Sequence, residues 1–220
     1  MHTGHHRPPD SIKIYSRAGL RLYDALVMGV LARHVWDCPA DAFVEHYRRH
    51  ITSNHADIGV GTGYCLDHCV FDTANPRLTL IDLQPNCLEY AARRLARYRP
   101  QVLVHDVLQP MPEVVDRFDS VGIGGVLHCL PGGMRNKSRV FDTIRSLTRS
   151  GAKIFGYSLV ADRGRRRTRG DFVLRILNRL RVVDNADDRI DDLMRELASR
   201  FQDCQVDRVG YLAFFSAVVK

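Results

Sequence analysis

Long apolar runs are missing from this chain, since no stretch approaches the roughly 20 residues that a membrane-spanning helix requires. The N-terminal segment Met1–Asp10 lacks the apolar centre of a secretory signal, and we expect it to be a disordered tail. Its histidines do not have the spacing of a structural zinc site. We therefore expect a protein without membrane insertion.

Paired cysteines are also missing. The six cysteines are dispersed and lie mostly among apolar neighbours, which is typical of reduced thiols in a cytoplasmic protein. They are Cys38, Cys65, Cys69, Cys87, Cys129 and Cys204. Cys65 and Cys69 lie one helical turn apart with His68 between them, and we interpret them as buried packing because free cysteine acts as a small hydrophobic residue. No metal is expected.

Acidic residues are outnumbered by basic ones, and the formal net charge of +7 by itself points toward nucleic acid. Five of the arginines, however, fall in the single run Arg163–Arg169. Such a run is more typical of a solvated loop than of a binding surface. We therefore do not expect nucleic acid as a partner.

Strands and helices are predicted to alternate through most of the 220 residues, which favours one α/β domain with a mostly parallel sheet and helices on both faces. Residues 11–50 are predicted as a helical lid with a break at Trp36–Pro39. Predicted strands cover residues 56–60, 78–83, 101–105, 118–124 and 151–159, and predicted helices cover 64–71, 86–98, 132–149, 172–180 and 190–201. Residues 204–209 and 212–219 are predicted as an antiparallel hairpin at the sheet edge.

A glycine-rich turn follows the first predicted strand. Gly59, Gly61 and Gly63 stand at alternate positions, so the backbone must turn tightly and allow close approach. Dinucleotide enzymes use Gly-x-Gly-x-x-Gly, whose third glycine would fall at Tyr64, and no lysine follows as in a P-loop. The spacing therefore indicates a compact group rather than a pyrophosphate.

Carboxylates follow the next two predicted strands. Asp82 ends the second strand, where a carboxylate can accept hydrogen bonds from both hydroxyls of a ribose. Asp106 follows the third, and Leu83 and Val107 are placed to sandwich an adenine ring. The alternatives are a helix N-cap for Asp82 and a loop carboxylate for Asp106.

These residues, with the fourth strand and the closing hairpin, resemble the class I S-adenosylmethionine-dependent methyltransferases. The resemblance implies a Rossmann-like seven-stranded sheet and S-adenosylmethionine as cofactor. It also implies the roles of the matching residues. Gly59, Gly61 and Gly63 would line the methionine part, Asp57 would position its amino group, Asp82 would hold the ribose, Asp106 would lie at the adenine, and Gly124 would border the sulfonium. The domain would comprise a lid (11–50), a cofactor-binding core (51–160), a helical insertion (161–201) and a hairpin (202–220).

His128 follows the fourth predicted strand, the edge that faces the reactive methyl group in the resembling fold. An imidazole there can act as general base, or it can pack near the cofactor and hydrogen-bond a backbone group. Further candidates for acceptor contacts are Tyr15, Tyr23, Tyr157, Asn185 and Arg163. For each of these, core packing, a cap or a solvated loop is the alternative role.

Several signatures of other methyltransferases are absent. The segment Gly122–His128 lacks the Asn/Asp-Pro-Pro-Tyr type motif of enzymes that methylate base amino groups or glutamine, and no carboxylate cluster of the catechol-methylating kind occurs. The size and the helical lid resemble methyltransferases of quinone and secondary-metabolite pathways. We predict methyl transfer to an oxygen, nitrogen or carbon atom of a small organic acceptor in a biosynthetic pathway. An RNA or protein methyltransferase that uses Arg163–Arg169, a non-catalytic partner subunit and a homodimer all stay open.

Overall fold

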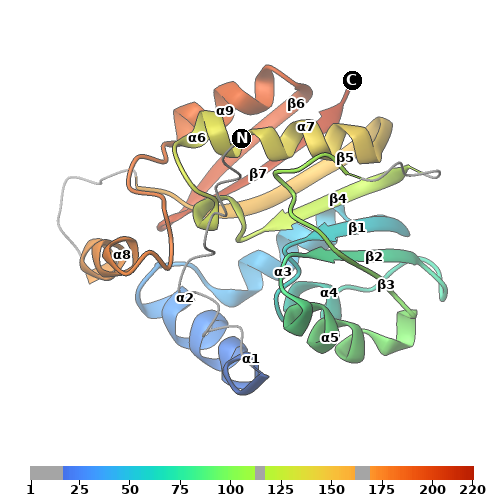
Figure 1. Ribbon diagram of the computed structural model, residues 1–220, viewed down its shortest axis with the longest axis horizontal. Helices are drawn as coiled ribbons and strands as arrows, with labels where there is room; N and C mark the ends of the chain where they lie inside the picture. Colours follow the sequence, from blue (N-terminus) through green and yellow to red (C-terminus); the bar gives the residue numbers. More distant parts are fainter. Residues whose placement is uncertain (1–16, 112–116, 162–168) are drawn as a thin grey trace, which may run out of the picture.

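A seven-stranded sheet forms the centre of this computed structural model, which describes residues 17–111, 117–161 and 169–220 (Figure 1). The strands are β1 (Asn54–Ile58), β2 (Arg77–Asp82), β3 (Gln101–Val104), β4 (Phe118–Gly124), β5 (Thr148–Leu159), β6 (Phe201–Val209) and β7 (Leu212–Val219). Their order is β3-β2-β1-β4-β5-β7-β6. Neighbouring strands among β1 to β5 are parallel, whereas β7 is antiparallel to both β5 and β6. The predicted mostly parallel sheet with an antiparallel C-terminal hairpin is confirmed.

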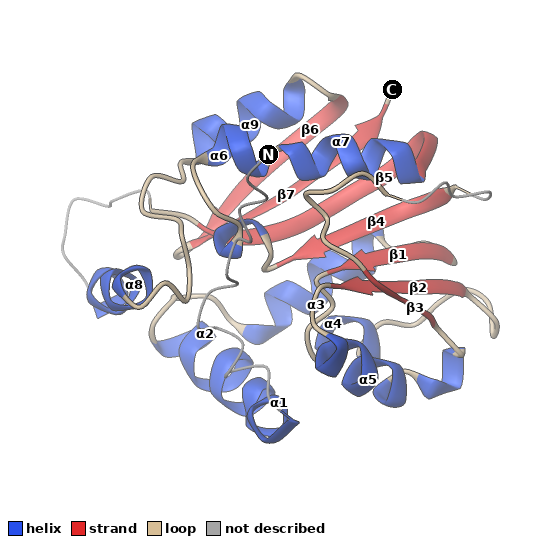
Figure 2. Ribbon diagram, in the orientation of Figure 1, coloured by secondary structure: helices blue, strands red, loops and turns tan. Residues whose placement is uncertain are grey.

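Helices cover both faces of the sheet (Figure 2). They are α1 (Arg17–Tyr23), η2 (Asp24–Leu31), α2 (Ala32–His34), α3 (Ala40–His50), α4 (Tyr64–Asp67), α5 (Pro85–Arg94), η3 (Ala96–Tyr98), η4 (Leu127–Cys129), α6 (Met134–Lys137), α7 (Arg139–Leu147), α8 (Arg169–Arg179) and α9 (Ile190–Ala198). Helices α6, α7 and α9 lie on one side, and α3, α4 and α5 on the other (Figure 1). None of the helices in the described ranges has the length and apolarity needed to cross a membrane.

The apolar core is split by the sheet into two clusters. Successive side chains of a strand point to opposite faces, so Phe155 of β5 joins the cluster beneath α3, α4 and α5, whereas its neighbour Ile154 joins the cluster beneath α6, α7 and α9. Both side chains are fully buried. Because β1 to β5 are parallel, their carboxyl ends lie at one edge of the sheet between these clusters.

Several predicted boundaries are wrong in detail. The predicted helix 64–71 ends at Asp67, and the predicted helix 132–149 begins at Met134 and is divided at Ser138. The Ser138 hydroxyl donates to the Arg135 carbonyl at 2.9 Å, and such local bonds compete with a continuous helix. Residues 148–150 belong to β5 instead. Of the predicted lid 11–50, residues 17–50 are described.

Candidate active site

The glycine turn between β1 and α4 has a backbone conformation that residues with a Cβ atom rarely adopt. Gly59, Gly61 and Gly63 have φ angles of +67°, +55° and +71°, the left-handed region that glycine adopts without steric penalty. A Cβ atom on Gly59 would lie 2.1 Å from Cγ2 of Val126. For Gly61 the nearest such neighbour is the Gly59 carbonyl oxygen at 4.0 Å, so a ligand can approach the backbone there.

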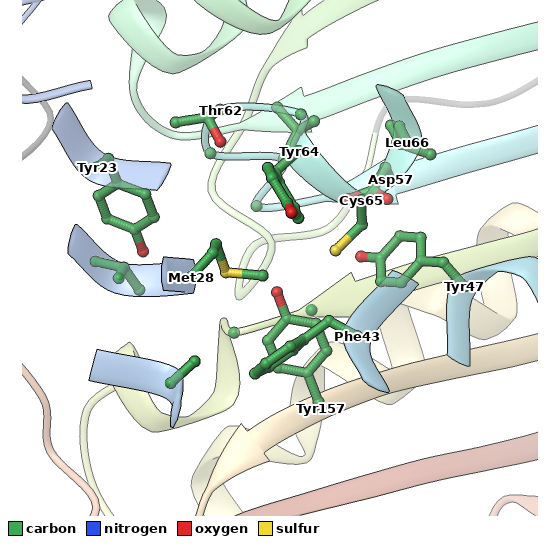
Figure 3. A pocket seen from close by; sticks show the side chains of 18 of the residues that line it. Tyr23, Met28, Phe43, Tyr47, Asp57, Thr62, Tyr64, Cys65, Leu66 and Tyr157 are labelled. Atoms are coloured by element: carbon green, nitrogen blue, oxygen red, sulfur yellow. The ribbon is translucent and has the colours of Figure 1, made fainter. Parts of the chain in front are cut away.

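A cavity of about 130 Å³ lies against this turn (Figure 3). Its walls come from the turn, from the lid, from α3 and from the carboxyl ends of β4 and β5. The lining residues include Tyr23, Val27, Met28, Trp36, Phe43, Tyr47, Asp57, the stretch Gly59–Leu66, Gly124, Gly125, His128, Tyr157 and Leu159. Figure 3 shows Met28 and Tyr157 approaching each other across this space. The cavity is therefore mostly apolar and aromatic, with one carboxylate at its edge.

Asp57 supplies that carboxylate. It is 2 % exposed, lines the cavity and accepts a hydrogen bond from the Tyr47 hydroxyl. Burial raises the pKa of Asp57, while the hydrogen bonds from His55 and Tyr47 lower it. A buried carboxylate of this kind attracts a cation, because a positive group offsets its lost hydration.

Asp82 lies at the carboxyl end of the neighbouring strand β2. Its Oδ1 accepts the Gln84 backbone N–H at 2.8 Å, and its Oδ2 accepts the Gly61 N–H at 3.3 Å. Burial raises the pKa of Asp82. The carboxylate thus joins the entry to α5 to the glycine turn, and each oxygen keeps a lone pair for a further donor.

The residues predicted at the adenine side follow β2 and β3. Leu83 is 50 % exposed, whereas Val107 is 7 % exposed and packs in the core beneath α7. Oδ1 of Asp106 accepts the Leu108 N–H at 3.0 Å and closes a turn. These three residues do not line the cavity described above, and they continue the same sheet edge beyond Asp82.

His128 lies in η4 and lines the cavity. Its Nδ1 accepts the Leu159 backbone N–H at 3.2 Å, and the Ser158 hydroxyl lies 3.4 Å from the same atom. Burial, with a smaller contribution from the Lys137 charge, lowers the pKa of His128 to about 3. The ring is therefore neutral near pH 7, and its proton is on Nε2 because Nδ1 is an acceptor.

The candidate acceptor residues are separated by the structure. Tyr23 and Tyr157 line the cavity from opposite sides. Asn185 does not line it, because its amide donates to the Leu159 carbonyl at 3.0 Å and its Oδ1 accepts from Asn178 at 2.8 Å. Tyr15 and Arg163 lie outside the described residues.

The structure also shows contacts that the sequence analysis missed. Asp24 of η2 accepts the Thr62 hydroxyl at 2.6 Å and an Arg94 N–H at 2.5 Å. Arg94 also donates to Asp67 at 2.8 Å. These bonds fasten the lid to the glycine turn, and no sequence motif marks them, since their partners are 38 and 70 residues from Asp24.

The thiols near the turn are packing groups. Cys65 and Cys69 are buried, and burial raises the pKa of both, that of Cys69 to about 12. His68 is exposed and bonds to the Tyr64 carbonyl at 2.8 Å. In the described part of the chain, no group of three or more His, Cys, Asp or Glu side chains is arranged to hold a metal ion.

Comparisons with known proteins agree with this geometry. A family model described as a methyltransferase domain matches residues 56–154. The demethylluteothin O-methyltransferase of Streptomyces thioluteus is 34% identical over 203 residues, which cover 92% of this chain and 88% of that protein. The physcion biosynthesis cluster O-methyltransferase of Aspergillus chevalieri is 31% identical, covering 94% of both chains. A solved complex of DhpI with SAH shares the fold, with a TM-score of 0.68, 19% identity and 95% coverage of both chains.

Proposed function

The chain belongs to the class I S-adenosylmethionine-dependent methyltransferases, and on that premise we propose that its acceptor is a hydroxyl oxygen of a small, mostly apolar molecule. The protein is an enzyme that methylates small molecules. The single observation that carries the choice of acceptor is the aromatic cavity between the lid and the glycine turn, in which Asp57 is the only Asp, Glu, Lys or Arg among the lining residues described.

The residues at the sheet edge fit S-adenosylmethionine. When bound, this cofactor supplies an electrophilic methyl group on a positively charged sulfur. The glycine turn leaves the backbone open to the methionine part, Asp57 offers a buried carboxylate to its ammonium, and Asp82 keeps lone pairs for the ribose hydroxyls. The fits at Asp57 and Asp82 each match a charge or donor on the cofactor with an acceptor in the protein.

The relatives support oxygen as the methylated atom. Two of them, with 34% and 31% identity over nearly the whole chain, are named O-methyltransferases. Another relative, from Penicillium aethiopicum and 30% identical, is named an N-methyltransferase. Asp57 is the one carboxylate among the lining residues described, and it is assigned here to the cofactor ammonium. A neutral amine becomes a cation on methylation and must then lose a proton, whereas a phenolate oxygen gives a neutral ether, so these residues favour oxygen.

His128 offers this acceptor a hydrogen-bond donor. The predicted general-base role requires a free lone pair on Nε2, whereas Leu159 directs the lone pair of the neutral ring to Nδ1. We propose that the Nε2–H group holds the acceptor oxygen, and that placement near the methyl group provides most of the rate. A phenol or enol suits such a site, since it ionises readily without a base in the protein.

Two substitutions of His128 separate the two roles. His128→Gln keeps an N–H donor near the position of Nε2, and kcat/KM is expected to stay within about threefold of wild type. His128→Asn keeps an acceptor for the Leu159 N–H but loses the donor, and kcat/KM is expected to fall about 10- to 100-fold, the value of one hydrogen bond to a charged oxygen. Steady-state kinetics measures both. Equal losses of about 100-fold or more in the two variants would support the general base instead.

Incubation with labelled S-adenosylmethionine tests the proposal directly. A panel of aromatic acceptors is used in matched pairs, each with a hydroxyl or an amino group at the same ring position. Label is expected in ether products of the hydroxyl members, identified by mass spectrometry. Label found only in the amine members would overturn the choice of oxygen, and label in RNA or protein would favour the alternative enzyme class.

The proposal also concerns the cellular location and the oligomeric state. A cytoplasmic location agrees with the dispersed thiols, which are reduced in that compartment. A homodimer stays a prediction, to be checked by light scattering. Of the arginine run Arg163–Arg169, only Arg169 belongs to the described residues, and it is the first residue of α8.

A further inference from the structure

A buried histidine lies directly behind Asp57. His55 and Asp57 both belong to β1 and point to the same face of the sheet, because side chains two residues apart in a strand share a face. His55 is completely buried, and its Nε2 lies 3.5 Å from Oδ2 of Asp57. His55 does not line the cavity, so it meets a ligand only through Asp57.

The hydrogen-bond partners on the two sides of the His55 ring determine which ring nitrogen carries the proton. Its Nδ1 lies 2.8 Å from the hydroxyl of Ser120, the partner of His55 on β4. The Ser120 oxygen accepts the Thr52 backbone N–H at 3.0 Å, and the Thr52 hydroxyl lies 2.9 Å away. The Asp57 carboxylate can only accept a hydrogen bond, so the ring nitrogen that faces it, Nε2, carries the proton, and Nδ1 accepts the Ser120 O–H.

The neighbours of the pair hold it in place. Phe155 stacks on the His55 ring, with centroids 5.6 Å apart and planes 19° apart. Gly122 stands opposite Asp57, and a Cβ atom there would lie 3.0 Å from Oδ2 of Asp57 and 3.2 Å from Cε1 of His55. Glycine therefore leaves the space that the two side chains occupy. The ring has no room to turn away from the carboxylate.

Asp57 receives donors from two directions, from His55 behind it and from Tyr47 of α3 beside it. Figure 3 shows the Tyr47 hydroxyl turned toward Asp57 and Cys65. A buried carboxylate stays ionised and oriented only when such donors offset its lost hydration. The Asp57 side chain also lines the cavity, where a ligand can meet it.

We propose that His55 is a positioning residue that keeps the Asp57 carboxylate ionised and directed at the ammonium group of the bound cofactor. This inference rests on the proposed function. It assigns His55 no contact with the adenosine part, so its loss weakens recognition of the amino acid end alone. Catalytic proton transfer is not part of this role.

Two ligands separate this role from a structural one. S-Adenosylhomocysteine carries the ammonium group, whereas 5′-methylthioadenosine has the same adenine, ribose and thioether without it. Calorimetry with the whole chain is expected to show at least a tenfold loss of S-adenosylhomocysteine affinity in His55→Phe, and 5′-methylthioadenosine affinity within twofold of wild type. His55→Gln, which keeps a donor at this position, is expected to restore most of the loss.

His50→Phe is the matched control. His50 also stacks on Phe155, with centroids 5.5 Å apart, and no contact with Asp57 is seen in the described part of the chain. It should bind both ligands as wild type does. If His55→Phe fails to fold, Ser120→Ala makes the same test by removing the hydroxyl that bonds Nδ1 and holds the ring in place, with an expected loss of about threefold for S-adenosylhomocysteine only.

Three results decide the matter. Equal losses for both ligands, or no loss for either, would overturn the role of His55. Failure of the wild-type protein to bind either ligand would instead overturn the proposed function. A selective loss in His55→Phe that His55→Gln restores would support both.

Discussion

Replacing Gly59 with alanine is expected to lower the free energy of unfolding by about 2–5 kcal/mol and to remove cofactor binding. The φ angle of +67° costs an L-residue about 1–2 kcal/mol. The new methyl group would also lie 2.1 Å from Cγ2 of Val126, a branched side chain that cannot swing aside without moving the β4–η4 connection. Any relief of this clash displaces the turn that approaches the cofactor.

Gly133→Ala is the control for this prediction. Gly133 has an ordinary φ of −77°, and a Cβ atom there meets nothing within 4 Å among the described residues. Thermal unfolding and calorimetric titration with S-adenosylhomocysteine measure both variants. A Gly59→Ala protein with the unfolding midpoint and affinity of wild type would contradict the geometry of the turn.

Replacing Lys137 with methionine is expected to destabilise the fold by about 3–5 kcal/mol. Lys137 is fully buried, and its ammonium group lies 2.6 Å from Oδ2 of Asp188 and also donates to the Asp184 carbonyl. Burial raises the pKa of Asp188 to about 6, against the opposing effect of Lys137. Without this cation, Asp188 would be a buried carboxylate with no compensating charge.

The double variant Lys137→Met with Asp188→Leu is expected to recover most of that stability. Apolar pairs of similar volume commonly replace a buried ion pair without loss, and Oδ1 of Asp188 already lacks a hydrogen-bond partner in the described structure. Urea unfolding midpoints of the single and double variants test this. Equal destabilisation in both would mean that packing, rather than the unpaired charge, explains the effect.

This ion pair is also connected to the wall of the cavity. The Asp184 backbone N–H donates to the His128 carbonyl at 2.8 Å, so the loop that Lys137 holds also supports η4. The destabilised single variant should therefore lose activity together with stability. The activity lost in the single variant should return in the double variant.

Much of the glycine turn and of the sheet edge beside it was predictable because their signals are local. The glycines are fixed by φ angles that few other residues adopt, and Asp57 and Asp82 end consecutive parallel strands whose carboxyl ends meet at one edge. The periodicity likewise predicted every strand of the sheet, with ends displaced by up to three residues. Short-range patterns thus predicted both the sheet and the edge at which the glycine turn and the two carboxylates meet.

The cavity walls were less predictable because they depend on long-range packing. Phe43 and Tyr47 look like an ordinary apolar helix face in the sequence, yet they line the cavity beside Tyr157. Asn185 was a candidate for acceptor contacts, and it instead connects α8 with the end of β5 through hydrogen bonds. These roles depend on contacts between segments that are far apart in the chain. No local motif of a single sequence marks such contacts.

Titration of S-adenosylhomocysteine into the wild-type protein and into Asp82→Ala tests the central claim most directly. Wild type is expected to bind one equivalent, and Asp82→Ala to bind at least about tenfold more weakly, since the ribose hydroxyls lose a charged acceptor. Asp82→Asn, which keeps an oxygen acceptor for the Gln84 N–H, controls for loss of the bond at the entry to α5. No binding by wild type, or equal affinity in wild type and Asp82→Ala, would contradict a cofactor site at this edge of the sheet.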